Sequence, residues 1–307
     1  MSRTVIVGLD GTAESRAAAD WGAREARLRS LDLTLVHARN WQPYVYAPLA
    51  GMSLPPDARE LERNGPEKLL ADVGSALRRS YPDLEVSSRV VSDEPVSALL
   101  NEAARAELLV LGSRGLSGIT GFIVGSVAHG VAARAAGPVV FVRGREHASD
   151  EHGQHAQGRA SAATPYRDVV LGLDCAHPDA AVLGFAFDAA VRRDVRLRVV
   201  HVWNVPPYYY GYGGVNVPGL KGQLESRVRQ DVADVVRPWR AKFPGVEVVE
   251  EALVGSAGLS LVAESRNASL VVVGRRKRRA PVGGHIGPVT QAVLHHCAAP
   301  VAVVPHD

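Results

Sequence analysis

An internal duplication is the feature that most constrains how this 307-residue chain folds. Four short apolar segments of the first half recur in the second half about 160 residues later. The matching pairs are residues 5–10 with 169–174, 33–37 with 197–201, 108–112 with 270–274, and 138–142 with 300–304. Because the offset barely drifts over most of the chain, we expect one folding unit of about 140 residues to occur twice.

The segment between the two copies separates the expected domains, which cover residues 1–144 and 166–307. Residues 145–165 are polar, with three histidines and almost no apolar side chains, which predicts an exposed linker. The histidines are unevenly spaced in a segment that cannot preorganise ligands. Metal binding is therefore the less favoured interpretation of them.

Within each copy, short strands rich in Val, Leu and Ile alternate with amphipathic helices. In the first copy we expect strands at residues 4–10, 32–39, 85–91, 107–112 and 138–143, and a first helix over residues 13–30. This alternation predicts an α/β fold whose parallel sheet carries helices on both faces. Such sheets bind ligands at the carboxyl ends of their strands, so the residues that follow each strand are the candidates for function.

Composition narrows the class of protein. The chain is 46% hydrophobic but only 6% aromatic, which suits buried parallel strands. A net charge of +3 with scattered charges argues against a nucleic-acid partner. No apolar run approaches the ~20 residues of a membrane span, and the chain opens on a strand pattern rather than a signal peptide. We therefore expect a cytoplasmic protein without a membrane partner. The chain has only two cysteines, which are too few for a disulfide framework.

A glycine-rich segment follows the fourth expected strand. Its spacing is Gly112, two residues, Gly115, nine residues, Gly125 and then Ser126. Glycines let a backbone approach a polyphosphate closely, and N–H groups at the following helix start bind anionic oxygens. The same residues also suit a flexible loop with a serine helix cap, so the glycines alone leave phosphate binding open.

Asp10 ends the first expected strand, where a carboxylate can accept hydrogen bonds from a base or a ribose. The alternative role for Asp10 is N-cap of the helix that starts near Ala13, and the two roles are compatible. Gly8 lies two residues earlier and leaves room for a loop or ligand to pass closely.

Together, residues 8–11, the His37–Ala38 end of the second strand and the spacing from Gly112 to Ser126 resemble the universal stress proteins. The resemblance covers both halves and implies a five-stranded, parallel, Rossmann-like sheet in each. It also implies ATP as the cofactor, accompanied by Mg²⁺, with no metal site built by the protein alone. The binding residues implied in the first domain are Gly8, Asp10, Ala38, Gly112, Ser113, Arg114, Gly115, Ser117, Gly118, Gly125, Ser126 and Val127.

By this resemblance, Asp10 contacts the adenine or ribose and the Ala38 backbone faces the adenine. Residues 112–118 wrap the phosphates, and residues 125–127 donate hydrogen bonds to them.

The second copy retains only part of this pattern. The corresponding binding residues are Gly172, Asp174, Val202, Gly274 and Gly287. Lys277 stands where the second glycine is expected, and Pro288, which has neither an N–H nor a hydroxyl, stands where serine is expected. The basic run 275–279 offers charge to a phosphate, although a solvated basic loop is the favoured interpretation. We expect the same fold with weak or absent ATP binding.

The leading hypothesis for function is an ATP-binding regulatory or sensing protein of the stress response, as the resemblance implies. A slow ATPase or nucleotide-transferring enzyme is a second hypothesis, for which Arg114 and Asp10 are the candidate groups, but the loop lacks a further acid. A nucleotide-free dimerisation scaffold is a third. The resemblance also suggests pairing of the two domains through their fifth strands, and a homodimer is a further possibility.

Three other features invite interpretation. His37 and His201 end the second strand of each copy and are interpreted as structural, since no nucleophile with an acidic partner accompanies them. The aromatic segments 41–46 and 206–214 are candidates for a partner contact, a pocket lid or a self-packed loop. Cys175 and Cys297 are expected too far apart for a disulfide.

Overall fold

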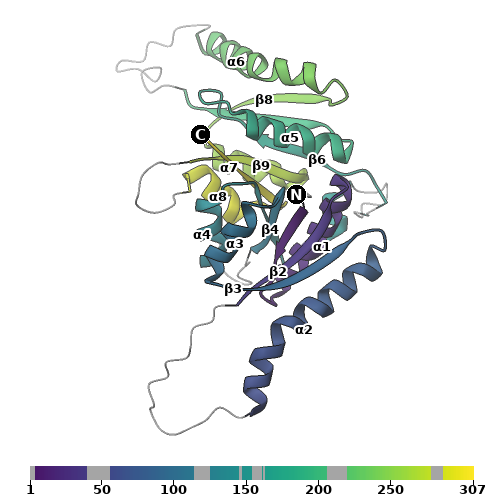
Figure 1. Ribbon diagram of the computed structural model, residues 1–307. Helices are drawn as coiled ribbons and strands as arrows, with labels where there is room; N and C mark the ends of the chain where they lie inside the picture. Colours follow the sequence, from purple (N-terminus) through teal and green to yellow (C-terminus); the bar gives the residue numbers. More distant parts are fainter. Residues whose placement is uncertain are drawn as a thin grey trace, which may run out of the picture. The chain divides into compact units, whose positions relative to one another are not determined.

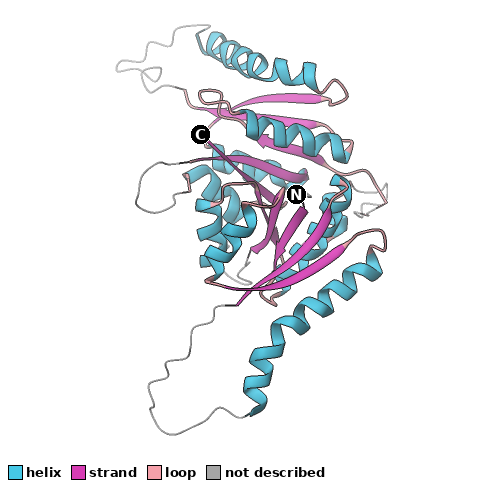
Figure 2. Cartoon of the chain, in the orientation of Figure 1, coloured by secondary structure: helices cyan, strands magenta, loops and turns pink. Residues whose placement is uncertain are grey.

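The computed structural model of the chain describes residues 4–39, 56–113, 125–144, 147–153, 161, 163–205, 220–277 and 286–307. The side chains of residues 56–63, 220 and 221 are not included in the description. The described chain separates into two compact units, one ending at Gly144 and the other beginning at His147. Helices and strands alternate along each unit (Figures 1 and 2).

Unit 1 is a five-stranded parallel sheet with the strand order β3-β2-β1-β4-β5. Its elements are β1 (Thr4–Gly8), α1 (Ala13–Arg29), β2 (Asp32–Arg39), α2 (Pro56–Ser80), β3 (Val86–Ser92), α3 (Pro95–Ala103), β4 (Leu108–Ser113), α4 (Ser126–Arg134) and β5 (Val139–Arg143). The order reverses between β1 and β4, so the carboxyl ends of these two strands border the crevice where doubly wound sheets bind ligands.

Unit 2 repeats this topology with the strand order β8-β7-β6-β9-β10. Its elements are η1 (Ala148–Glu151), β6 (Asp168–Gly172), α5 (Ala180–Arg193), β7 (Leu197–Trp203), α6 (Leu220–Lys242), β8 (Val248–Val254), α7 (Ala257–Glu264), η3 (Ser265–Asn267), β9 (Ala268–Arg276), α8 (Pro288–His296) and β10 (Val301–His306). Two Rossmann-like α/β units are thus present, as the sequence predicts.

Helices cover both faces of each sheet. In unit 1, a Cβ atom placed on Gly22 of α1 would lie 2.6 Å from Val7 Cγ2, whereas one placed on Gly8 would lie 3.1 Å from Leu99 Cδ2 of α3. Val7 and Gly8 are adjacent on β1 and point to opposite faces, so α1 and α3 pack on opposite sides. The strands between them are buried on both faces, which explains their continuous Val, Leu and Ile runs.

The segment between the repeats is partly folded, and in this respect the expectation of an exposed linker is wrong. Glu151 and His152 are only 2% and 6% exposed. His152 forms an antiparallel bridge with Tyr166, and the His152 carbonyl accepts a hydrogen bond from Arg167 Nε at 2.8 Å. Backbone pairing therefore compensates for the scarcity of apolar side chains between residues 147 and 153.

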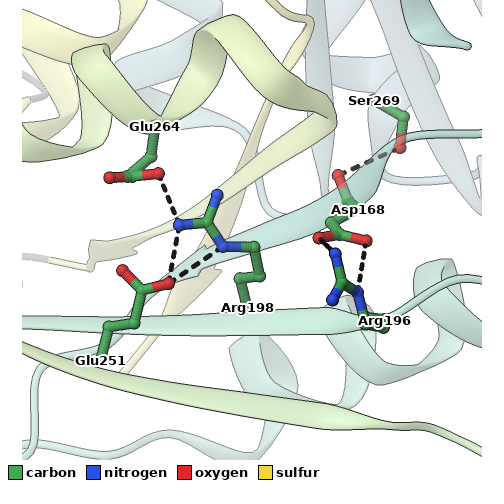
Figure 3. A network of polar contacts seen from close by, with 6 residues as sticks. All are labelled: Asp168, Arg196, Arg198, Glu251, Glu264 and Ser269. Atoms are coloured by element: carbon green, nitrogen blue, oxygen red, sulfur yellow. Dashed lines mark hydrogen bonds and ion pairs between the residues drawn. The ribbon is translucent and has the colours of Figure 1, made fainter. Parts of the chain in front are cut away.

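An ion-pair network in unit 2 shows how the copies diverge. Arg198 Nη2 on β7 lies 2.7 Å from Glu251 Oε1 of β8 and 2.6 Å from Glu264 Oε2 of α7 (Figure 3). In unit 1, Arg89 of β3 occupies the position equivalent to Glu251 and pairs with Glu102, the equivalent of Glu264. The arginine that pairs with this glutamate therefore lies on β3 in unit 1 and on β7 in unit 2.

Among the described residues, no helix combines the length and apolar character that crossing a bilayer requires.

Candidate functional site

A pocket of about 320 Å³ lies at the carboxyl ends of β1, β2 and β4 in unit 1. It is lined by the predicted residues Gly8, Asp10, Ala38, Gly112, Gly125, Ser126 and Val127. Four other predicted residues, Arg114, Gly115, Ser117 and Gly118, lie outside the described residues. The topology therefore gathers residues from four distant parts of the chain at one crevice.

The Ser113 side chain is directed elsewhere. It is buried, and its Oγ donates a hydrogen bond to the Val142 carbonyl of β5 at 3.2 Å. This bond is made across the β4–β5 pair, so the Ser113 hydroxyl serves the sheet rather than the pocket. Within the described residues, Ser113 is the predicted binding residue of unit 1 that does not line the pocket.

Asp10 shapes the turn that precedes α1. Its Oδ1 accepts hydrogen bonds from the Thr12 backbone N–H at 3.0 Å and from Thr12 Oγ1 at 2.5 Å. Thr12 is the N-cap of α1, because its Oγ1 accepts the Ser15 N–H at 3.2 Å. Gly11, between them, has φ +87°, which favours glycine. Thr12, not Asp10, is therefore the N-cap of α1, and the N-cap role considered for Asp10 is wrong. The Asp10 carboxylate is instead held at the pocket wall by Thr12.

His37 ties β2 to the loop that follows β1. Its Nδ1 lies 2.8 Å from the Leu9 carbonyl oxygen, and since a carbonyl can only accept, Nδ1 carries the proton. This bond agrees with the structural interpretation of His37. His37 also lines the pocket, as do Pro95 and Leu99 of α3, which no motif in the sequence indicated.

The start of α4 supplies backbone donors. Gly125 is its N-cap, and the His129 N–H donates to the Gly125 carbonyl at 2.8 Å as the helix begins. The N–H groups of Ser126, Val127 and Ala128 precede that bond, and all three residues line the pocket. Such a helix start attracts anions.

The packing of the protein around Gly8 and Gly112 leaves little room for a larger side chain. A Cβ atom on Gly112 would lie 2.6 Å from the Glu14 backbone carbon and 2.7 Å from the Ser15 nitrogen, so α1 begins directly against β4. A Cβ atom on Gly8 would lie 2.6 Å from Leu111 Cδ2, which forms part of the pocket floor. Helix backbone therefore requires glycine at position 112, whereas at position 8 a larger residue would displace the Leu111 side chain.

Unit 2 has a larger pocket at the equivalent place, with a volume of about 430 Å³. It is lined by all five predicted residues of this unit, which are Gly172, Asp174, Val202, Gly274 and Gly287. The histidine bond is also repeated, since His201 Nδ1 lies 2.9 Å from the Leu173 carbonyl oxygen.

The second pocket differs from the first on the side that corresponds to the glycine-rich segment and the start of α4. The Lys277 backbone N–H donates to the His306 carbonyl at 2.7 Å, and Lys277 Nζ lies 3.6 Å from Asp307 Oδ1. The residue at the second glycine position is thus fixed to the end of β10. Pro288 is the first residue of α8, so this helix start has one N–H fewer than that of α4.

The second pocket also extends in a direction that is filled in unit 1. Relative to the repeat, α5 begins about one turn later than α1, with Asp179 as its N-cap. A Cβ atom on Gly274 would therefore meet His306 Nε2 at 2.8 Å, a side chain rather than helix backbone. We call the space lined by His177, Asp179, Val182, Leu183, Arg276 and His306 the side extension.

Neither cysteine forms a disulfide, and their surroundings differ. Cys297 is fully buried at the end of α8. Burial, reinforced by the nearby carboxylates of Asp174 and Asp231, raises the pKa of the Cys175 thiol to about 11.

Comparison with known proteins identifies the family to which this chain belongs. The chain matches the Universal stress protein family over residues 1–143 and again over residues 165–305. A universal stress protein of Mycobacterium tuberculosis is 32% identical over 305 residues, which cover 97% of this chain and 96% of the relative. One from Mycolicibacterium smegmatis is 28% identical over 307 residues, covering 98% and 96%.

A solved structure supports the same assignment at the level of the fold. The crystal structure of a universal stress protein from Archaeoglobus fulgidus covers 100% of both chains with a TM-score of 0.67 and 15% identity. The chain therefore belongs to the universal stress protein family and carries one domain of that family in each half.

Proposed function

We propose that unit 1 binds ATP together with Mg²⁺, and that the protein acts in the stress response as a cytoplasmic regulator or sensor whose state depends on nucleotide occupancy. The observation that carries the proposal is the convergence of Asp10, Ala38 and the start of α4 on one pocket of about 320 Å³. The similarity to universal stress proteins of mycobacteria supports the stress-response part.

The chemistry of the pocket suits a nucleoside at one end. Leu9, Val36, Leu99 and Leu111 provide apolar surface for a base. The Asp10 carboxylate, fixed by Thr12, is an acceptor suited to ribose hydroxyls.

The other end of the pocket suits phosphates. The first N–H groups of α4 and the Ser126 hydroxyl are donors at a helix start, where the helix dipole favours negative charge. The described residues contain no cluster of three potential metal ligands, so Mg²⁺ would be held mainly by the ATP phosphates. Bound Mg²⁺ would neutralise phosphate charge.

Identification of the nucleotide that the purified protein retains, followed by calorimetric titration with ATP and Mg²⁺, tests this proposal. Intact ATP and a saturable binding isotherm are expected. ADP with measurable turnover would instead favour the slow ATPase. If no nucleotide is retained and titration detects no ATP binding, the proposal is wrong and the nucleotide-free scaffold is favoured.

A further inference from the structure

The second pocket keeps the part of the first that suits a nucleoside. Gly172, Asp174 and Val202 repeat Gly8, Asp10 and Ala38, and the histidine-to-carbonyl bond is repeated at His201. As in unit 1, the carboxylate orders its own turn, because Asp174 Oδ1 accepts the Ala176 N–H at 3.0 Å. A base and ribose would therefore meet similar surroundings in both units.

The backbone donors for a long phosphate chain are reduced in the second pocket. The Lys277 N–H is used by the His306 carbonyl, and Pro288 has no N–H to give. Lys277 also carries a side chain where the first unit has Gly115. A polyphosphate that follows the course expected in unit 1 would lose contacts at two separate points.

The side extension provides different groups for an anion. Arg276 and His306 are register partners on the parallel strands β9 and β10, so their side chains lie on the same face of the sheet. The nearby carboxylates already have partners. Asp179 accepts the Ala181 N–H at 2.8 Å and lies 3.9 Å from His306 Nδ1, and Asp174 Oδ2 lies 3.2 Å from His177 Nδ1. Within the described part of the chain, no carboxylate is paired with Arg276.

We propose that unit 2 binds a nucleoside monophosphate in preference to ATP, with the single phosphate held by the side chains of Arg276 and His306 in the side extension. The selectivity follows from geometry: one phosphate reaches the Arg276 side of the pocket, whereas a triphosphate also needs the backbone donors that Lys277 and Pro288 remove. Arg276 supplies a planar, permanently charged group that suits a phosphate. This inference concerns a second site and does not rest on ATP binding by unit 1.

The test uses the full-length chain carrying Ser126→Pro, which removes two phosphate donors from the first pocket. Calorimetry with AMP and the three other common ribonucleoside monophosphates, ATP and adenosine then reports on unit 2. We expect at least one monophosphate to bind at one molecule per chain and about tenfold or more tightly than ATP. Arg276→Gln should weaken monophosphate binding about tenfold, as expected for one charge-assisted hydrogen bond, and leave binding of the matching nucleoside unchanged.

Arg227→Gln is the matched control, because Arg227 is an exposed arginine of α6 whose partner is Asp231 at 3.1 Å, and it does not line the pocket. It should leave monophosphate binding unchanged. Arg276 is exposed, so its replacement should not unfold the domain, which thermal denaturation checks. The proposal is overturned if no monophosphate binds, if ATP binds more tightly than every monophosphate, or if Arg276→Gln and Arg227→Gln have equal effects. Absence of ATP binding to the unmodified first pocket would refute only the function proposed for unit 1.

Discussion

Replacement of Ser126 with proline separates binding from folding, because unit 2 already contains proline at the equivalent position. Pro288 begins α8 as Ser126 begins α4. The preceding glycines have nearly the same backbone, with φ −57° and ψ 154° at Gly125 and φ −64° and ψ 157° at Gly287. These ψ values suit a residue before proline, and the first N–H of a helix has no intrahelical acceptor to lose. We expect the free energy of unfolding to change by less than about 0.5 kcal/mol.

The effect on ATP binding should be much larger. Ser126→Pro removes both the backbone N–H and the hydroxyl that face the expected phosphate position. A hydrogen bond to a charged group contributes about 1.5–3 kcal/mol, and each 1.4 kcal/mol changes the dissociation constant tenfold. Loss of two such bonds should weaken ATP binding roughly a hundredfold or more.

Calorimetric titration with ATP and Mg²⁺ measures this loss, and chemical denaturation checks the fold. Ser126→Ala is the matched control, since it removes the hydroxyl but keeps the N–H, and about a tenfold loss is expected from it. If folded Ser126→Pro protein bound ATP within about threefold of the unmodified chain, the phosphates would not lie at the start of α4 and the site would be wrong.

Three further outcomes are expected. Asp10→Ala should weaken ATP binding by at least about 1.5 kcal/mol, as measured by calorimetry. An unchanged affinity would mean that Asp10 only orders its own turn. Gly112→Ala should lower the free energy of unfolding by about 1–3 kcal/mol in urea denaturation, because its Cβ would meet helix backbone. Gly274→Ala should lower it less, because its Cβ would meet the movable His306 ring. Equal losses in the two variants would contradict this packing. With a pKa of about 11, Cys175 should react with iodoacetamide slowly at pH 8 and faster as the pH rises toward 11, which mass spectrometry can follow; rapid labelling at pH 8 would contradict the raised pKa.

The arrangement of strands could be predicted from the sequence because it depends on local pattern. Fully buried parallel strands must be apolar on both faces, and the runs at residues 32–39 and 138–143 therefore coincide with β2 and β5 to within one residue. The first strand was expected to reach Asp10 but ends at Gly8. The difference arises because Asp10 is used to form the turn before α1 rather than to extend the ladder.

The side extension could not be predicted from the duplication alone, because it depends on where a helix begins. The duplication suggests the same start for α1 and α5, whereas Asp179 caps α5 about one turn late. Pro178 followed by Asp179 was a usable sequence indication of this later start. That His306 then occupies the space beside Gly274 is a tertiary contact between distant residues, which no local pattern encodes.

The charge exchange around Glu264 provides a physical reason to expect different ligands in the two halves. The equivalent Glu102 is buried, and a buried carboxylate is costly without a cation, which Arg89 supplies. Glu264 is 25% exposed and is also paired with an arginine, Arg198. The arginine comes from β3 in unit 1 and from β7 in unit 2, so the carboxylate is paired in both copies while the strand that supplies the arginine differs. The same argument applies at the pockets, because a bound anion needs hydrogen-bond donors. In unit 2, Pro288 has no backbone N–H and the Lys277 N–H is bonded to the His306 carbonyl. The side chains of Arg276 and His306 line the pocket and can act as donors instead. Because side chains compensate charge at a different point from a helix start, the two pockets should select anions of different length.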